Sequence, residues 1–251
     1  MHEIWFESAG TRLFAVESGQ GAPIILLHGG LATHLATRRF AAALETQFRI
    51  ITPDLRGSGR SIHAEPLSWD LLADDVAALV AHLGLEKAVI GGVSFGAGCA
   101  VRVALRHPAV TAALVVLHPA FAGADVGLMP AQDSAMRAMD AAGSRAVTDG
   151  MQALFPLCET LPPEMREPVK ALFATYDPAS VAATTHFMAS GAQPFASAAE
   201  LASITVPTLL VPGVDATHPR EVADVYRCIP DLHTVETPDF AAAIAGFLER
   251  P

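Results

Sequence analysis

The stretch GGVSFGAG at residues 91–98 places one serine, Ser94, among four glycines, directly after the apolar run KAVI at residues 87–90. Such a run is typical of a strand buried on both faces, and the amphipathic pattern at residues 96–107 predicts a helix. A sharp turn from strand to helix crowds the backbone two residues before and after the serine, where Gly92 and Gly96 stand. The turn would present the hydroxyl at the carboxyl end of a strand, beside a helix N-terminus. We therefore interpret Ser94 as a nucleophile rather than an idle turn residue.

Two phosphate-binding patterns do not fit the same stretch. A G-x-G-x-x-G fingerprint would need glycine at position 101, where Val101 stands, and no G-K-[ST] follows. The glycines therefore fit the presentation of a serine better than the binding of a nucleotide.

The rest of the chain alternates short apolar runs with helical patterns. Period-two alternation predicts an antiparallel hairpin at 3–8 and 11–17. Apolar runs predict further strands at 23–28, 48–53, 87–93, 111–118, 206–213 and 232–237. Amphipathic patterns predict helices at 36–46, 69–84, 96–107, 219–229 and 238–250. Strands that alternate with helices imply right-handed crossovers, so we expect an α/β fold with a mostly parallel sheet and helices on both faces.

One long segment breaks this alternation. Residues 120–203 contain only helical patterns, broken by Pro and Gly, and every methionine except the initiator. We therefore expect a core domain formed by 1–119 and 204–251, with 120–203 as a helical insertion. The methionines either fill gaps between helices or form an adaptable apolar wall over a pocket, and a lid could use them for both.

The composition narrows the function classes. Of the 251 residues 51% are hydrophobic and 17% charged, and the formal net charge is −10. This balance fits one large core and argues against nucleic acid or an anionic membrane as a partner. The three cysteines, Cys99, Cys158 and Cys228, are too scattered for a disulfide framework or a zinc site. With no signal-peptide pattern and no apolar run of about 20 residues, we expect a soluble, cytoplasmic protein without a metal.

Four segments, taken in order, give the chain a resemblance to the α/β-hydrolase fold superfamily over nearly its whole length. They are His28-Gly29-Gly30, PDLRGSGRS at 53–61, GVSFGAG at 92–98 and ITVPTLLVPGVDATHP at 204–219. The resemblance implies a nucleophile, an acid, a histidine, no cofactor, and a helical cap inserted after the sixth core strand. Residues 120–203 stand at that place.

Within this resemblance, two backbone N–H groups would form the oxyanion hole. Phe95, which follows the nucleophile, would supply one and Gly30 the other, with Leu31 as the less favoured donor. We expect His28 to be a structural residue of the same loop and assign no chemistry to PDLRGSGRS.

The acid is expected at Asp215, after the apolar run at 206–213. There a carboxylate would orient an imidazole and stabilise its charged form. Asp125 is the alternative, because some members of the superfamily place the acid after the preceding strand.

The histidine is where the sequence departs from the superfamily. A Gly-His usually follows the last strand, but this chain has no histidine after His233. If 232–237 is a strand, His233 lies at its start, roughly 13 Å from the carboxyl end at about 3.3 Å per residue. His218 follows the acid by three residues, in a loop at the correct end of the sheet. We therefore favour His218, with His233 or no competent base as alternatives; His34 and His186 could face the pocket but are more readily explained without a role.

These residues predict a cofactor-free serine hydrolase of a small, largely apolar ester or lactone. Perhydrolysis and carbon–carbon bond hydrolysis are related possibilities on the same fold. The missing Gly-His motivates an alternative hypothesis, a non-hydrolytic or ligand-binding protein on the same scaffold.

Overall fold

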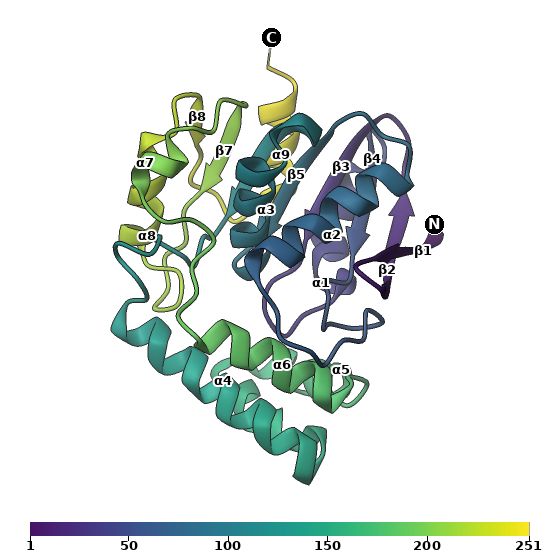
Figure 1. The fold of residues 1–251 in the computed structure, drawn as a ribbon, viewed down its shortest axis with the longest axis vertical. Coiled ribbons are helices and arrows are strands. Elements are labelled where there is room, and N and C mark those ends of the chain that lie inside the picture. Colours follow the sequence, from purple (N-terminus) through teal and green to yellow (C-terminus); the bar gives the residue numbers. More distant parts are fainter. Residues whose placement is uncertain (251) are drawn as a thin grey trace.

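The computed structural model describes residues 1–250, which build one sheet of eight strands in the order β1-β2-β4-β3-β5-β6-β7-β8 (Figure 1). The strands are β1 (His2–Ser8), β2 (Thr11–Ser18), β3 (Ala22–Leu27), β4 (Phe48–Pro53), β5 (Ala88–Val93), β6 (Thr111–Leu117), β7 (Thr208–Val211) and β8 (Leu232–Thr234). Strand β2 pairs antiparallel with β1 and β4, and the other neighbours are parallel. The predicted fold class, with its antiparallel N-terminal hairpin, is confirmed.

The register of the parallel strands brings several strand ends to one edge of the sheet. Leu27 pairs with Gly92 between β3 and β5, and Val93 pairs with Leu117 between β5 and β6. Leu117 in turn pairs with Val211 at the end of β7. Side chains that follow these ends therefore meet at the same edge, although the sequence separates them widely.

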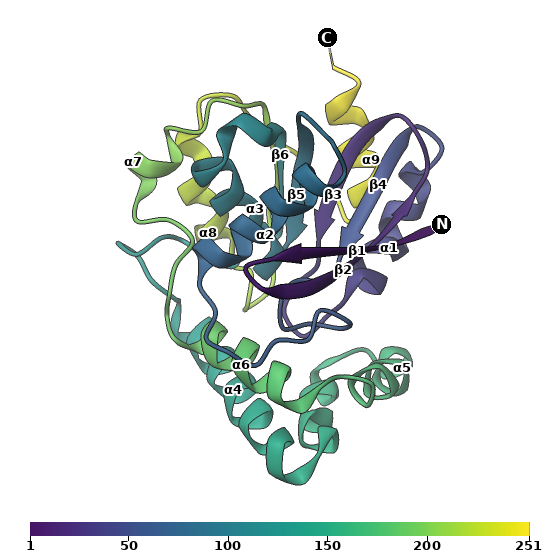
Figure 2. The ribbon, with the colours of Figure 1, turned by 45° about the vertical axis from the view of Figure 1, so that its right-hand side comes forward.

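Helices cover both faces of the sheet, and each face has its own apolar core (Figure 2). One face carries α2 (Trp69–His82), α3 (Phe95–Arg106) and α8 (Arg220–Val225), and the other carries α1 (His34–Ala41) and α9 (Phe240–Leu248). The strands between them are buried on both sides, which explains their continuous apolar runs.

Four helical segments lie together between β6 and β7 in the chain, as a layer below the sheet in Figure 1. They are α4 (Pro130–Asp149), a 3-10 helix (Met151–Thr160), α5 (Pro163–Phe173) and α6 (Pro178–Ala189), and the short α7 (Ala198–Leu201) follows them. The layer has its own buried cluster, which includes Leu154, Cys158, Phe173 and Val181. We call this layer, within residues 120–203, the helical insertion.

Several element boundaries differ from the prediction. Helix α1 begins at His34 because Thr33 caps it by accepting from the Leu35 N–H, and it gives way to a 3-10 turn at Ala42. Helix α8 likewise ends at Val225 in a 3-10 turn. Strand β8 stops at Thr234 instead of continuing to 237, because its neighbour β7 already ends at Val211. In residues 1–250 no helix is both long enough and apolar enough to span a membrane.

Candidate active site

Ser94 occupies a strained turn between β5 and α3. Its φ of 56° and ψ of −113° lie outside the regions that side chains ordinarily adopt. A Cβ atom on Gly92 would lie 2.3 Å from the backbone of Gly96, and one on Gly96 would lie 2.5 Å from the carbonyl oxygens of Leu27 and His28. Only glycine therefore fits on either side of the serine, as the sequence pattern predicted.

The structure brings His218 to this serine. The imidazole Nε2 of His218 is 2.8 Å from Ser94 Oγ. On the other side of the ring, Nδ1 lies 3.0 Å from both carboxylate oxygens of Asp215. The carboxylate can only accept, so Nδ1 carries a proton and Nε2 is left to accept the hydroxyl proton of Ser94. The three side chains thus form a continuous chain of hydrogen bonds.

A tight turn brings the acid and the histidine together. Asp215 Oδ1 accepts from the N–H groups of Thr217 (2.8 Å) and His218 (2.9 Å), and from the Thr217 hydroxyl (2.7 Å). An aspartate side chain that binds the backbone just ahead of it is a common way to close a turn. Gly213 permits the fold-back, since a Cβ atom there would lie 2.3 Å from the Cβ of His218.

The same contacts set the charge state of the acid. Partial burial raises the pKa of Asp215. Hydrogen bonds from Thr217 and His218, together with the charge of the imidazolium, lower this pKa by more than burial raises it. The net pKa lies well below the usual aspartate value, so Asp215 is ionised at neutral pH. An ionised carboxylate at this position can orient the imidazole of His218 through its Nδ1 proton.

The loop after β3 lies against the serine turn. A Cβ atom on Gly29 would lie 3.6 Å from the Cβ of Ser94, and one on Gly30 would lie 3.9 Å from the Cβ of Phe95. The two residues chosen as oxyanion donors, Gly30 and Phe95, are therefore neighbours. Phe95 is also the first residue of α3, where a backbone N–H has no partner within the helix. Leu31, the alternative donor, has a φ of 53°.

The side chain of His28 connects this loop to the segment after β4 through hydrogen bonds. The side chain is buried; Nε2 accepts from the Leu55 N–H at 2.9 Å and Nδ1 donates to the Gly29 carbonyl at 2.8 Å. Burial lowers the pKa of His28, so the imidazole stays neutral. Asp54 gives further support, because its carboxylate accepts from both the backbone N–H and the ring Nδ1 of His34, each at 2.8 Å.

The alternative candidates lie elsewhere. His233 is opposite Leu209 in the β7–β8 pairing, two residues before β7 ends, and its ring packs on Phe247. Asp125 is exposed, and its N–H donates to the carbonyl of Ala196. His186 is exposed beside Asp140. Across residues 1–250, no group of three or more His, Cys, Asp or Glu side chains is placed to hold a metal ion.

Two residues near the site have contacts that the sequence does not indicate. His118 follows β6 with a φ of 45°, and its ring centroid lies 6.0 Å from that of His218. Burial, and then the charge of His218, lowers the pKa of His118. Gln132, in α4, donates to the backbone of the Asp215–His218 turn. Gln132 also accepts from the Met129 N–H at the start of α4, a common contact at helix starts. Nothing in the sequence indicates its contact with Thr217.

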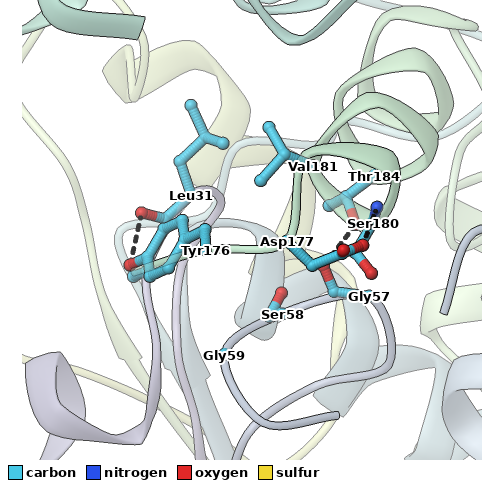
Figure 3. A pocket seen from close by; sticks show the side chains of 10 residues that line it. Leu31, Gly57, Ser58, Gly59, Tyr176, Asp177, Ser180, Val181 and Thr184 are labelled. Atoms are coloured by element: carbon cyan, nitrogen blue, oxygen red, sulfur yellow. Dashed lines mark hydrogen bonds between the residues drawn. The ribbon is translucent and has the colours of Figure 1, made fainter. Parts of the chain in front are cut away.

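A small cavity lies between the helical insertion and the core loops (Figure 3). Leu31, Ser58, Tyr176, Val181 and Thr184 are among its lining residues. The Tyr176 hydroxyl donates to the Leu31 carbonyl at 3.3 Å across one side of it. The insertion is therefore bonded directly to the loop that follows β3.

Comparison with known proteins identifies the family to which this fold belongs. The sequence profile of the α/β-hydrolase fold matches residues 22–211. The chain belongs to the α/β-hydrolase fold family. Among solved members, a thermophilic esterase from Thermogutta terrifontis aligns over 99% of this chain and 98% of its own, with a TM-score of 0.79 and 25% identity. The enol-lactonase from Burkholderia xenovorans LB400 aligns over 98% and 100%, with a TM-score of 0.79 and 22% identity, a likeness of fold alone.

Curated relatives match a smaller part of this α/β-hydrolase. The AB hydrolase superfamily protein YisY of Bacillus subtilis (strain 168) is 40% identical over 97 residues, 38% of this chain and 36% of that protein. The chain therefore spans about a third to two fifths of the curated relatives it matches.

Proposed function

We propose that this protein is a cofactor-free serine hydrolase of small, largely apolar carboxylic esters or lactones. The observation that carries the proposal is the 2.8 Å contact between Ser94 Oγ and His218 Nε2, with Asp215 on the far side of the ring. A serine hydroxyl is a weak nucleophile until a base in hydrogen-bond reach can take its proton. Esterases and lactonases among the solved relatives are consistent with this chemistry.

Acylation would proceed in two steps at this site. Ser94 Oγ bonds to the substrate carbonyl carbon while its proton passes to Nε2 of His218. The carbonyl π electrons move to the oxygen, where the amides of Gly30 and Phe95 stabilise the negative charge. When the tetrahedral intermediate collapses, the bond to the alcohol oxygen breaks and His218 gives that oxygen the proton. In a lactone the alcohol stays attached to the acyl chain.

Deacylation would repeat the sequence with water. A water molecule gives a proton to His218 as its oxygen bonds to the acyl carbon. The second intermediate expels Ser94 Oγ, which recovers the proton, and the carboxylic acid leaves. Asp215 holds the imidazole ring and favours its charged form in both halves without taking a proton.

The surroundings of the site favour an apolar substrate. The Met188 side chain, from α6, lies against Gly30, since a Cβ atom on that glycine would come within 2.4 Å of the Met188 methyl carbon. The Phe95 ring packs against Trp69 and Phe187, with centroids 5.0 and 6.1 Å apart. We propose that residues 120–203 act as a cap whose apolar side chains limit the size of the acyl group.

Hydrolysis of p-nitrophenyl acetate and butyrate tests the proposal. We expect turnover by the wild type, none above background for Ser94→Ala, and a fall in kcat of about 10³-fold or more for His218→Ala. His233→Ala is the matched control and should keep wild-type kcat. Turnover that survives Ser94→Ala would rule out the nucleophile, and loss in His233→Ala but not in His218→Ala would reassign the base.

The alternative hypothesis, a non-hydrolytic protein, rests on the missing Gly-His. A wild type that releases no p-nitrophenol from either ester and is not labelled at Ser94 by an alkyl fluorophosphonate would support that hypothesis against ours.

A further inference from the structure

We propose that Gln132, in the helical insertion, positions the turn that carries Asp215 and His218. The inference rests on the proposed function and adds a residue that touches none of the reacting atoms. It assigns the insertion a second task beyond shaping the substrate pocket.

The amide of Gln132 is fully engaged in the structure. The side chain is 1% exposed and comes from the first turn of α4. Its Nε2 donates to the carbonyl of Thr217 at 2.8 Å and to that of Ala120 at 2.9 Å, while its Oε1 accepts from the Met129 N–H at 2.9 Å. The partners fix which atom is nitrogen, because two of them are acceptors and the third is a donor.

A hydrogen bond to the Thr217 carbonyl acts on the part of the turn that sets the positions of Asp215 and His218. Thr217 stands between the acid and the base, and both its N–H and its hydroxyl bind Asp215. Because Asp215 and His218 are tied to each other within the turn, any shift of the turn moves both relative to Ser94. The Asp215 side chain is 56% exposed, so packing around the carboxylate itself restrains it little. A bond from a buried amide to the middle of the turn supplies that restraint.

Gln132 ties the turn to the sheet as well as to the insertion. Ala120 lies two residues after His118, whose N–H donates to the Val211 carbonyl at the end of β7. One side chain thus joins the segment that leaves β6 to the turn that follows β7. Loss of the amide would leave two buried or partly buried carbonyls without a donor. A displacement of about 1 Å at a catalytic group can cost roughly 100-fold in rate.

If Gln132 served only to start helix α4, its loss would affect stability and not the catalytic turn. Two variants distinguish this role from the positioning role. Gln132→Met removes all three bonds at similar volume. Gln132→Glu keeps an acceptor for the Met129 N–H but turns an oxygen toward the carbonyls of Thr217 and Ala120. Tyr226→Phe is the matched control, because Tyr226 also joins the core to the segment after β6 through a buried bond, from its hydroxyl to the Phe121 carbonyl at 2.9 Å.

The experiment measures kcat and KM for p-nitrophenyl butyrate, and the rate at which an alkyl fluorophosphonate labels Ser94. For both Gln132 variants we expect kcat and the labelling rate to fall by about tenfold or more, with KM within about threefold. Tyr226→Phe should stay within about twofold of wild type in all three, with any cost confined to Tm. Wild-type kcat in Gln132→Glu, or an equal loss in Tyr226→Phe, would overturn the inference.

A readout without substrate separates this inference from the proposed function. Backbone hydrogen exchange at Thr217 and His218 should be faster in Gln132→Met than in wild type or Tyr226→Phe. If the wild type had no Ser94-dependent turnover, the proposed function would fail and faster exchange would still show that Gln132 holds the turn. Unchanged exchange would overturn the inference whatever the activity.

Discussion

The imidazole of His218 faces the carboxylate of Asp215 across a turn of only three residues, with Nδ1 3.0 Å from each carboxylate oxygen. Members of the superfamily that this chain resembles usually carry the histidine some 25 to 30 residues beyond the acid, after the last strand. Here one turn carries both, and its own hydrogen bonds fix their mutual geometry. The position of the pair relative to Ser94 depends on how that turn packs against the rest of the molecule.

The first prediction concerns the acid. In Asp215→Asn the remaining oxygen can still accept from the N–H groups of Thr217 and His218, so the turn should keep its shape. The new NH₂ group, however, would face the Nδ1 proton of His218. We expect kcat for p-nitrophenyl butyrate to fall by about 10²- to 10⁴-fold with little change in Tm. Asp125→Asn is the control, and a loss in that variant instead would move the acid to Asp125.

The second prediction concerns Gly213, whose lack of a side chain lets the Asp215–His218 turn pack closely against it. In Gly213→Ala the added Cβ would lie 2.3 Å from the Cβ of His218 and 2.5 Å from its carbonyl oxygen. The turn must shift, so we expect kcat to fall by about tenfold or more at unchanged KM. In Gly246→Ala, in α9, the added Cβ meets nothing within 4 Å. That control should keep wild-type kcat and gain up to about 1 kcal/mol of stability. Full activity in Gly213→Ala would show that the turn tolerates displacement.

The third prediction concerns substrate size. Met188→Ala removes the side chain that lies against Gly30, so the site should accept longer acyl chains. The ratio of kcat/KM for the octanoate to that for the butyrate should rise by about fourfold for each further methylene buried. Met136→Ala, at another buried methionine of the insertion, should lose stability without changing this ratio. An unchanged ratio in Met188→Ala would mean that the acyl chain binds elsewhere.

The fourth prediction concerns acid pH. Burial lowers the pKa of His28 in the folded protein, whereas in the unfolded chain the imidazole takes up a proton near pH 6.5. Because the unfolded state then binds more protons, the free energy of unfolding falls as the pH drops below about 6.5. The loss from this one group should be about 1 kcal/mol at about pH 5.5, or about 2–4 °C in Tm.

His28→Gln isolates this contribution. Its neutral amide can accept from the Leu55 N–H, as Nε2 of His28 does at 2.9 Å. The variant should therefore show a smaller difference in Tm between about pH 7.5 and about pH 5.5 than the wild type. Equal differences would mean that His28 is not the group responsible.

Some parts of the site could be predicted because they depend on local sequence. The turn at Ser94 needs small residues two positions before and after it, so Gly92 and Gly96 mark it without any knowledge of distant contacts. The turn from Asp215 to His218 is local in the same sense, since the aspartate side chain binds amides two and three residues ahead. Gln132 could not be predicted, because its partners Ala120 and Thr217 are related only through the packing of the insertion on the sheet.

The sequence by itself determined the order of strands and helices and the serine turn, because each follows from burial patterns or from contacts within a few residues. It left open whether His218, His233 or no histidine reaches Ser94. Only the tertiary structure decided that distance. Ser94 and His218 stand 124 positions apart, and they meet because the parallel register of β5, β6 and β7 ends those strands at one edge. There Gly213 lets the turn fold back toward the serine.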